Sequence, residues 1–198
     1  ATILGLRPPK NPVDAQRPYA FFVEKERCVE GRVEDVATVF LTNKECPFRC
    51  LMCDLWKSTT DAPVPPGAIP EQIRWALGQL PTARHIKLYN SGSFFDPGAV
   101  PISDYPAIAE FVSPFRTIIV ESHPRMIGDR CFAFRDLLAG GLQVAMGLET
   151  VHRGTLAKLN KKMTIEDFSI AVDALRHHGI PARAFILLRP PFQGETEG

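Results

Sequence analysis

The most informative stretch of this chain is Val36-Ala-Thr-Val-Phe-Leu-Thr-Asn-Lys-Glu-Cys-Pro-Phe-Arg-Cys-Leu-Met-Cys53. Its first six residues are apolar or β-branched, and such a run predicts a strand buried on both faces. The strand leads into a loop that holds three of the five cysteines of the chain, Cys46, Cys50 and Cys53. Because parallel α/β folds bind ligands at the carboxyl ends of their strands, this loop stands where chemistry is expected.

The same strand signal recurs four times further along the chain, with helical patterns between the repeats. Strands are predicted at Ile86–Tyr89, Thr117–Val120, Leu142–Met146 and Ala184–Leu188, and helices at Pro70–Leu80, Ala107–Val112, Gly128–Ala139 and Ile165–His177. The last helix has the clearest pattern, with Ile165, Phe168, Val172 and Leu175 on one face and Thr164 as its N-cap. Apolar strands that alternate with helices predict an α/β fold built on a parallel sheet.

The composition is that of an ordinary globular protein. The chain has 198 residues, 45% of them hydrophobic, and 23 Lys and Arg against 22 Asp and Glu give a net charge of +1. This balance argues against a protein that binds nucleic acid through a broad basic surface. No apolar run reaches the ~18 residues of a membrane span, so we expect no membrane partner. Residues 1–34, rich in proline and charge, are expected to form a leader packed on the domain, and residues 35–198 form the domain.

The spacing of the loop cysteines, C-x3-C-x2-C, favours a metal site. Three thiols packed this tightly, within an odd total of five, indicate a reducing compartment, and we expect a cytoplasmic protein. A structural zinc site closes with four ligands, whereas three thiolates suit a [4Fe–4S] cluster with one open iron. Three alternatives remain: buried cysteines that only pack, an iron–sulfur electron-transfer or scaffold protein without turnover, and a structural zinc element of a nucleic-acid-binding protein.

The cysteine loop after a first strand resembles the signature of radical S-adenosylmethionine enzymes. The stretches Thr42–Cys46, Asn90–Phe94, Glu121–Pro124 and Gly147–Thr150 are similar to the first four strand ends of that superfamily. The likeness extends over residues 36–198. It is greatest to the branch that contains the elongator catalytic subunit, the oxygen-independent coproporphyrinogen oxidase and the archaeosine-forming radical enzyme.

This resemblance implies a partial (βα)6 TIM-like barrel, here truncated after the fifth predicted strand. It implies a [4Fe–4S] cluster on Cys46, Cys50 and Cys53, whose open iron would be chelated by the amino and carboxylate groups of S-adenosylmethionine. One-electron reduction would then yield a 5′-deoxyadenosyl radical that abstracts hydrogen from a substrate. The chain is therefore expected to be a radical S-adenosylmethionine enzyme.

The resemblance also assigns the contacts of S-adenosylmethionine to particular residues. Ser91, Gly92 and Ser93 stand where the family receives the methionine amino group, although an ordinary turn is the alternative. Glu121 is expected to contact the ribose or the ammonium group.

Three further cofactor contacts follow from the same likeness. Glu149 is expected at the ribose hydroxyls, and Met52 is expected to pack near the adenine. Lys161 is expected at the methionine carboxylate, and a solvated cation is the alternative for it.

The expected partners are a one-electron reductant such as flavodoxin or ferredoxin and a substrate. Members of the family act on tRNA bases, porphyrinogens and other molecules, and the resemblance favours a tRNA base. A (βα)6 barrel that stops after five predicted strands leaves one sheet edge open. We therefore expect further chain, or a second copy of the protein, to cover that edge.

Overall fold

The structure is a computed structural model that describes residues 2–28 and 31–194. Its strands are β1 (Ala20–Arg27), β2 (Val33–Phe40), β3 (His85–Tyr89), β4 (Thr117–Ser122), β5 (Gly141–Glu149) and β6 (Ala182–Ile186). Its α-helices are α1 (Thr2–Gly5), α2 (Ala68–Leu77), α3 (Tyr105–Val112), α4 (Asp129–Leu137), α5 (Arg153–Lys158) and α6 (Ile165–His177). Three short 3-10 helices lie at Leu55–Ser58, Ile102–Asp104 and Pro124–Met126.

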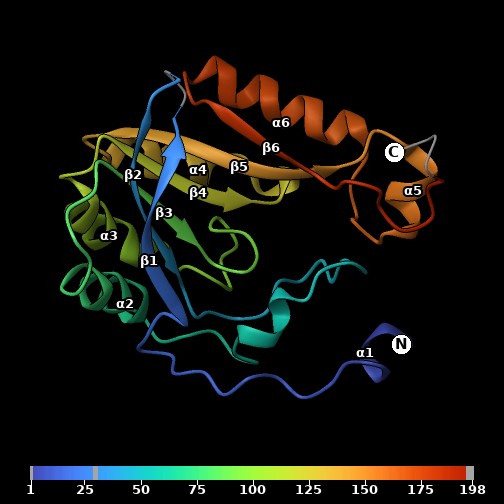
Figure 1. Ribbon diagram of the computed structural model, residues 1–198, viewed down its shortest axis with the longest axis horizontal. Coiled ribbons are helices and arrows are strands. Elements are labelled where there is room, and N and C mark those ends of the chain that lie inside the picture. Colours follow the sequence, from blue (N-terminus) through green and yellow to red (C-terminus); the bar gives the residue numbers. More distant parts are fainter. Residues whose placement is uncertain (1, 29–30, 195–198) are drawn as a thin grey trace.

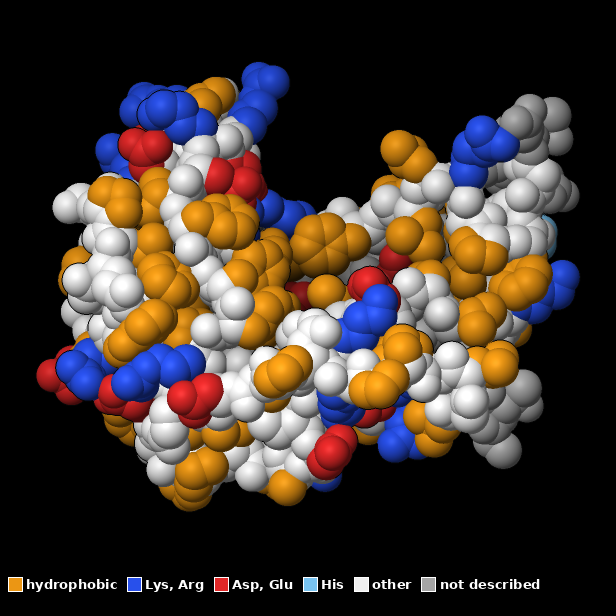
Figure 2. Space-filling model, turned by 60° about the horizontal axis from the view of Figure 1, so that its bottom comes forward, with side chains coloured by type: hydrophobic (Ala, Val, Ile, Leu, Met, Phe, Trp, Pro, Cys, Tyr) orange, Lys and Arg blue, Asp and Glu red, His pale blue; other side chains and the backbone are white. Residues whose placement is uncertain are grey.

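The six strands form one curled sheet in the order β1-β2-β3-β4-β5-β6. β1 is antiparallel to β2, and each of the four later pairs is parallel. The sheet bends into a half-barrel with helices on its outer face (Figure 1), and the space-filling view shows a hollow that contains hydrophobic and acidic side chains (Figure 2). The predicted α/β class and the partial TIM-like barrel are confirmed.

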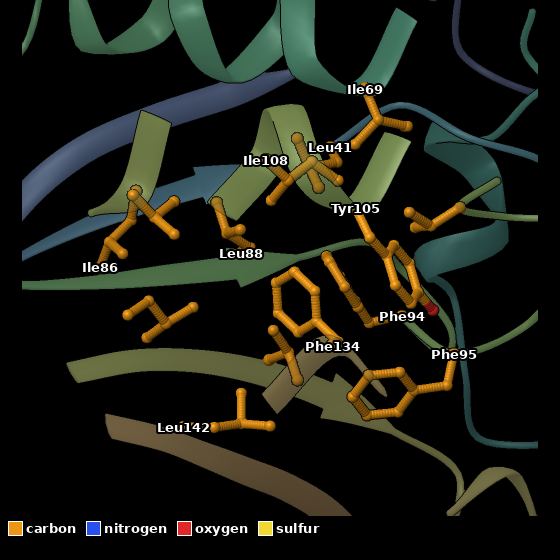
Figure 3. Packing of buried hydrophobic residues seen from close by; sticks show 14 of the residues in the cluster. Leu41, Ile69, Ile86, Leu88, Phe94, Phe95, Tyr105, Ile108, Phe134 and Leu142 are labelled. Carbon is orange, nitrogen blue, oxygen red and sulfur yellow. The ribbon is translucent and has the colours of Figure 1, made fainter. Parts of the chain in front are cut away.

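The hydrophobic core lies between the outer face of the sheet and the helices. Ile86 and Leu88 of β3 pack with Ile108 of α3 and Phe134 of α4, and all four side chains are fully buried (Figure 3). Successive side chains of a strand point to opposite faces, so Lys87 between them faces the inside of the barrel. The outer face is therefore apolar, and the inner face is free to carry polar groups.

Helix α6 has the bounds that its sequence predicts. The Thr164 hydroxyl accepts a hydrogen bond of 3.1 Å from the Asp167 amide, and the Asp167 carboxylate accepts one of 2.9 Å from the Thr164 amide. This reciprocal capping box fixes the first turn. At the other end, Gly179 adopts a φ of 66°, which stops the helix.

Strand β1 and helix α5 are absent from the sequence-based expectations. β1 lies within residues 1–34 and pairs with β2 along its whole length, from Ala20 opposite Phe40 to Arg27 opposite Val33. Its half-exposed, charge-rich sequence gives no signal of a buried strand, because an edge strand of a curled sheet is exposed on one side. The last strand also begins and ends two residues earlier than predicted.

The segment before β1 lies along the cysteine loop (Figure 1). The Asn11 amide donates a 2.8 Å hydrogen bond to the Lys57 carbonyl, and the Arg7 guanidinium lies 2.7 Å from the Glu45 carboxylate. The same guanidinium stacks over the Trp56 ring at 4.4 Å. The N-terminal residues thus help to position the cysteine loop. Within the described ranges, none of the helices is long and apolar enough to pass through a membrane.

Candidate active site

A cavity at the carboxyl ends of the parallel strands brings together nine of the ten residues predicted for the site. It is lined by the predicted residues Cys46, Cys50, Met52, Cys53, Ser91, Gly92, Glu121, Glu149 and Lys161. Four loops that are distant in the sequence therefore meet at one place, because parallel strands put all their carboxyl ends on the same edge.

Ser93 is the one predicted residue that does not line the cavity. Its side chain is buried, and its hydroxyl lies 2.9 Å from that of Ser122 and accepts a hydrogen bond from the His123 amide. Ser93 therefore ties the ends of β3 and β4 together, away from the cavity.

The cysteine loop is held in place by the segment that follows α5. The Leu51 amide donates a 2.8 Å hydrogen bond to the Leu159 carbonyl. The Asn160 side-chain amide donates to the Arg49 and Phe48 carbonyls at 2.9 and 3.3 Å. The cysteine loop has no regular secondary structure. Its path is fixed by these hydrogen bonds to residues that lie more than 100 positions later in the chain.

All three loop cysteines are partly buried, and burial raises the pKa of each thiol. The pKa of Cys46 rises to about 11. For Cys50, the nearby ammonium group of Lys161 opposes the effect of burial on the pKa. The pKa of Cys53 is raised by burial and by the Glu121 and Asp54 carboxylates, against hydrogen bonds from the Leu55 and Trp56 amides. A coordinated metal would be needed to hold these thiols as thiolates at neutral pH.

The turn after β3 rests on a buried carboxylate. Glu121 accepts hydrogen bonds from the amides of Asn90 and Gly92, and burial raises its pKa against the effect of these bonds. The Ser91 hydroxyl lies 2.8 Å from the Tyr19 hydroxyl of the segment before β1. A Cβ at Gly92 would lie 3.1 Å from the Cβ of Cys46, so only glycine lets this turn approach the cysteine loop without a shift.

Glu149 and Lys161 form a buried ion pair on the opposite wall. The Lys161 ammonium lies 2.7 Å from the Glu149 carboxylate, and each side chain is 10% exposed. Lys161 is therefore not the solvated cation that was its alternative. A Cβ at Gly147 would fall 2.1 Å from Glu149 Oε1 and 2.4 Å from Lys161 Nζ. Glycine at this position leaves the space in which the two side chains meet.

His123 and Phe48 are cavity residues that the sequence did not single out for function. Their rings stack with centroids 3.5 Å apart. His123 Nδ1 accepts a hydrogen bond from the Arg125 amide, which leaves Nε2 to donate to the Lys161 carbonyl at 2.9 Å. Burial lowers the pKa of His123 to about 4, so the ring is neutral. The sequence signal for His123 was a histidine before a proline at the end of a predicted strand. Nothing in the sequence indicated a role for Phe48.

The site also concentrates unusual backbone geometry. Of the seven described residues other than glycine that have positive φ, three line the cavity: Arg49 at 53°, Ser91 at 55° and Glu149 at 66°. Two more, Asn160 and Lys162, flank Lys161 in the chain. Such conformations cost about 1–3 kcal/mol each and cluster at binding and catalytic sites.

Sequence comparison gives no matching family model, but it finds two curated relatives. Uncharacterized protein MJ0550 of Methanocaldococcus jannaschii is 23% identical, over 93% of this chain and 54% of its own length. Archaeosine synthase subunit beta of Thermococcus kodakarensis is 25% identical, over 75% of this chain and 49% of its own length. The chain thus spans about half the length of the curated relatives it matches.

Structure comparison places the fold among radical S-adenosylmethionine enzymes. OxsB, a cobalamin-dependent S-adenosylmethionine radical enzyme solved with aqua-cobalamin and S-adenosylmethionine, matches with a TM-score of 0.54 and 16% identity, over 80% of this chain and 25% of its own. Its apo form matches with a TM-score of 0.52 and 17% identity, over 81% of this chain and 26% of its own. The predicted resemblance to the radical S-adenosylmethionine superfamily is confirmed at the level of the fold.

Proposed function

We propose that this chain is the barrel of a radical S-adenosylmethionine enzyme, with a [4Fe–4S] cluster on Cys46, Cys50 and Cys53. The observation that carries the proposal is the single cavity that these cysteines share with six residues expected to bind S-adenosylmethionine. Together, the cluster and S-adenosylmethionine supply reductive cleavage to a 5′-deoxyadenosyl radical for hydrogen abstraction. The barrel supplies orientation and excludes water.

The donor set fits a cluster better than a single zinc ion. In tetrahedral zinc thiolate sites, Zn–S bonds of about 2.3 Å bring the sulfurs within about 3.8 Å of one another. Among the described residues, the three loop sulfurs are not found as a group within 4.8 Å of one another. His123 also lines the cavity, but both of its ring nitrogens are already hydrogen-bonded. Carboxylates of Glu45, Glu121 and Glu149 also line the cavity, but they are engaged with cationic side chains or backbone amides. The three sulfurs therefore serve as the protein ligands and leave one iron position for S-adenosylmethionine.

The two walls of the cavity carry complementary groups for the ends of S-adenosylmethionine. The turn at Ser91 and Gly92 faces the cysteine loop, where carbonyl and hydroxyl oxygens accept hydrogen bonds from the amino group. Lys161 provides a positive charge for the carboxylate, and Glu149 accepts hydrogen bonds from ribose hydroxyls. Glu121 acts as a positioning residue, because its carboxylate holds the amides of the turn.

Met52 is proposed to pack against the adenine. It lines the cavity one residue before Cys53, and its thioether is soft and adaptable in contact with a ring. The neutral His123 ring holds the carbonyl of Lys161, so it fixes the backbone from which the ammonium group projects.

A tRNA base is the proposed class of substrate. The similarity to archaeosine synthase subunit beta supports it, at 25% identity over 75% of this chain. We further propose a flavodoxin- or ferredoxin-like reductant, a cytoplasmic location and a second chain over the open edge beside β6. Leu188, just beyond β6, is 93% exposed, which supports such a cover.

The test is anaerobic reconstitution with iron and sulfide, followed by reduction with dithionite and addition of S-adenosylmethionine. We expect S-adenosylmethionine to change the electron paramagnetic resonance spectrum of the cluster and 5′-deoxyadenosine to be released slowly. Cys50→Ala should give neither signal, whereas Cys131→Ala, on the buried face of α4, should give both. An intact four-iron cluster that neither responds to S-adenosylmethionine nor releases 5′-deoxyadenosine would overturn the proposal in favour of an electron-transfer protein.

A further inference from the structure

A second group of metal-ligating side chains lies at the opposite end of the barrel, at the amino ends of β2 and β3. Cys28 follows the last residue of β1, Glu34 is the second residue of β2, and His85 is the first of β3. One ligand atom from each, a sulfur, a carboxylate oxygen and an imidazole nitrogen, lies within 4.8 Å of the other two. No role in the proposed radical chemistry involves any of these three residues.

The strand register explains why these side chains converge. Arg27 pairs with Val33, and Val36 pairs with His85, so the ends of three adjacent strands meet here. Glu34 and His85 project from the start of their strands toward the barrel floor, where the turn from β1 to β2 carries Cys28. Cys28 lies close to the start of β2, since its amide donates a 2.8 Å hydrogen bond to the Arg32 carbonyl.

Two of the three groups are already in contact, and His85 is buried. His85 Nε2 lies 2.8 Å from Glu34 Oε2, and the two side chains are 4% and 13% exposed. Arg84 lies 3.4 Å from the other carboxylate oxygen, Oε1, and so orients the carboxylate without occupying Oε2. The Cys28 thiol lies 3.7 Å from the Glu26 carbonyl, a weak contact that a metal would replace.

A small cavity adjoins the group. It has a volume of about 30 Å³, and its lining includes Cys28, His85 and, from β5, Gln143. This is room for one or two water molecules, enough for a metal-bound water. Arg183 also lines this cavity, but its guanidinium is engaged with Glu26 and Gln143.

We propose that Cys28, Glu34 and His85 bind one divalent transition-metal ion of the zinc type at the floor of the barrel. Sulfur, imidazole and carboxylate are the three donor types that zinc takes in proteins, and a water from the adjoining cavity completes four-coordination. Donor atoms around tetrahedral zinc lie about 3–4 Å apart, so His85 Nε2 and Glu34 Oε2 must separate slightly from 2.8 Å while the three donors close around the ion. Binding releases the thiol proton of Cys28, and the proton shared by His85 and Glu34 moves to His85 Nδ1, so that the neutral imidazole ligates through Nε2. The negative charges of thiolate and carboxylate balance the ion.

The ion would hold the β1–β2 turn to β3. Among the strands of the described residues, β1 is hydrogen-bonded to β2 alone. A metal that joins Cys28 to His85 adds a link from β1 to the second strand along. Because β1 also carries the Glu26 contact to Arg183 of β6, this link would help to fix both edges of the half-barrel.

The experiment uses a Cys46→Ser, Cys50→Ser, Cys53→Ser background, so that the upper cysteines cannot bind the added metal. Cobalt(II) is titrated into the metal-free protein, and thiolate-to-cobalt charge transfer is followed in the near ultraviolet. Bound zinc is measured separately by elemental analysis after dialysis, and circular dichroism checks that each variant is folded. We expect one equivalent of cobalt with a charge-transfer band and a zinc-dependent rise in melting temperature.

Adding Cys28→Ser should abolish the charge-transfer band and weaken zinc binding by tenfold or more, whereas adding Cys131→Ala should change neither. His85→Gln should retain the band only at much higher cobalt concentrations. The proposal is overturned if the background protein binds no cobalt, or if Cys28→Ser leaves the band intact. Either result is independent of the cluster proposed above, because the three upper cysteines are absent from every protein in this test.

Discussion

The two ends of the half-barrel differ in how their polar groups are satisfied. Below the cavity, Lys87 lies 2.7 Å from Glu24 and also contacts Glu26, which in turn pairs with Arg183. These opposite charges neutralise one another within regular β-strands. At the carboxyl ends, Ser91 has a positive φ and the loop thiols have raised pKa values. Local rules are broken at the end where the proposed cluster and S-adenosylmethionine would bind, and they are kept among the paired charges below the cavity.

The largest effect should come from the loop cysteines. Replacing Cys46, Cys50 or Cys53 by alanine should abolish stable binding of four irons after anaerobic reconstitution, because three ligands leave none to spare. Iron and sulfide content per chain would measure this. Cys131→Ala should retain the full iron and sulfide content. A loss of iron in this variant, with the fold preserved, would contradict the assignment of only the three loop cysteines as cluster ligands.

The next largest effect is expected at Glu149. Glu149→Ala should retain iron but bind S-adenosylmethionine at least about tenfold more weakly, since a hydrogen bond to a charged group contributes roughly 1.5–3 kcal/mol. Isothermal titration calorimetry of the reconstituted protein gives the affinity. Glu166→Ala is the matched control, because this glutamate pairs with Arg153 on the exposed surface. Equal affinities of the two variants would argue against a role for Glu149 in binding.

A smaller effect on a different quantity is expected at the barrel floor. Lys87→Met should lower the free energy of unfolding by about 2 kcal/mol. This lies between the contributions typical of exposed and of buried ion pairs, because Lys87 is buried but its partners Glu24 and Glu26 are partly exposed. Urea unfolding followed by circular dichroism would measure it. The affinity for S-adenosylmethionine should not change. If it fell as much as in Glu149→Ala, the two ends of the barrel would be coupled.

The charged residues at the barrel floor should also make the stability of the protein depend on pH. Burial favours the protonated form of Glu26, but hydrogen bonds from Lys87 and Arg183 outweigh it and lower the pKa below 4.5. A carboxylate with a lowered pKa stabilises the fold fully above its unfolded pKa, and this contribution is lost as the pH falls through the folded value. Urea midpoints should therefore fall below about pH 4.5. The fall should be shallower in Lys87→Met, and an equal slope in both proteins would contradict the assignment to Glu26.

The smallest effect is expected on the outer surface. Thr164→Ala removes one half of the capping box of α6 and should cost about 1 kcal/mol of stability. Thermal unfolding would show it as a lower melting temperature. Iron content and S-adenosylmethionine affinity should stay at the values of the unaltered protein, because the cap lies on exposed backbone outside the cavity.

Predictions from the sequence succeeded where local patterns and burial agree. The apolar runs at Ile86–Tyr89 and Thr117–Val120 lie inside observed strands, and Ile165–His177 is a helix with its cap. The placement of Cys46, Cys50 and Cys53 beside a strand end follows from the same regularity. The roles of the site residues stay predictions, but nine of the ten line one cavity.

What the sequence missed depends on partners that are distant along the chain. β1 is recognisable as a strand only beside β2, because its exposed face carries charges that mask the strand pattern. The approach of Phe48 to His123 brings together loops that no spacing rule relates.

By itself, the sequence determined the alternation of strands and helices from β2 to β6, without α5, and the loop that gathers three cysteines. It also indicated the kind of chemistry that three closely spaced cysteines favour. These properties depend on periodicity and on ligand types, which can be read from neighbouring residues. Only the tertiary structure decided that Lys161 is buried against Glu149, that Glu121 holds a turn, and that Cys28 lies beside His85. The curling of the sheet sets these distances, since it brings strand ends together independently of their separation in the chain.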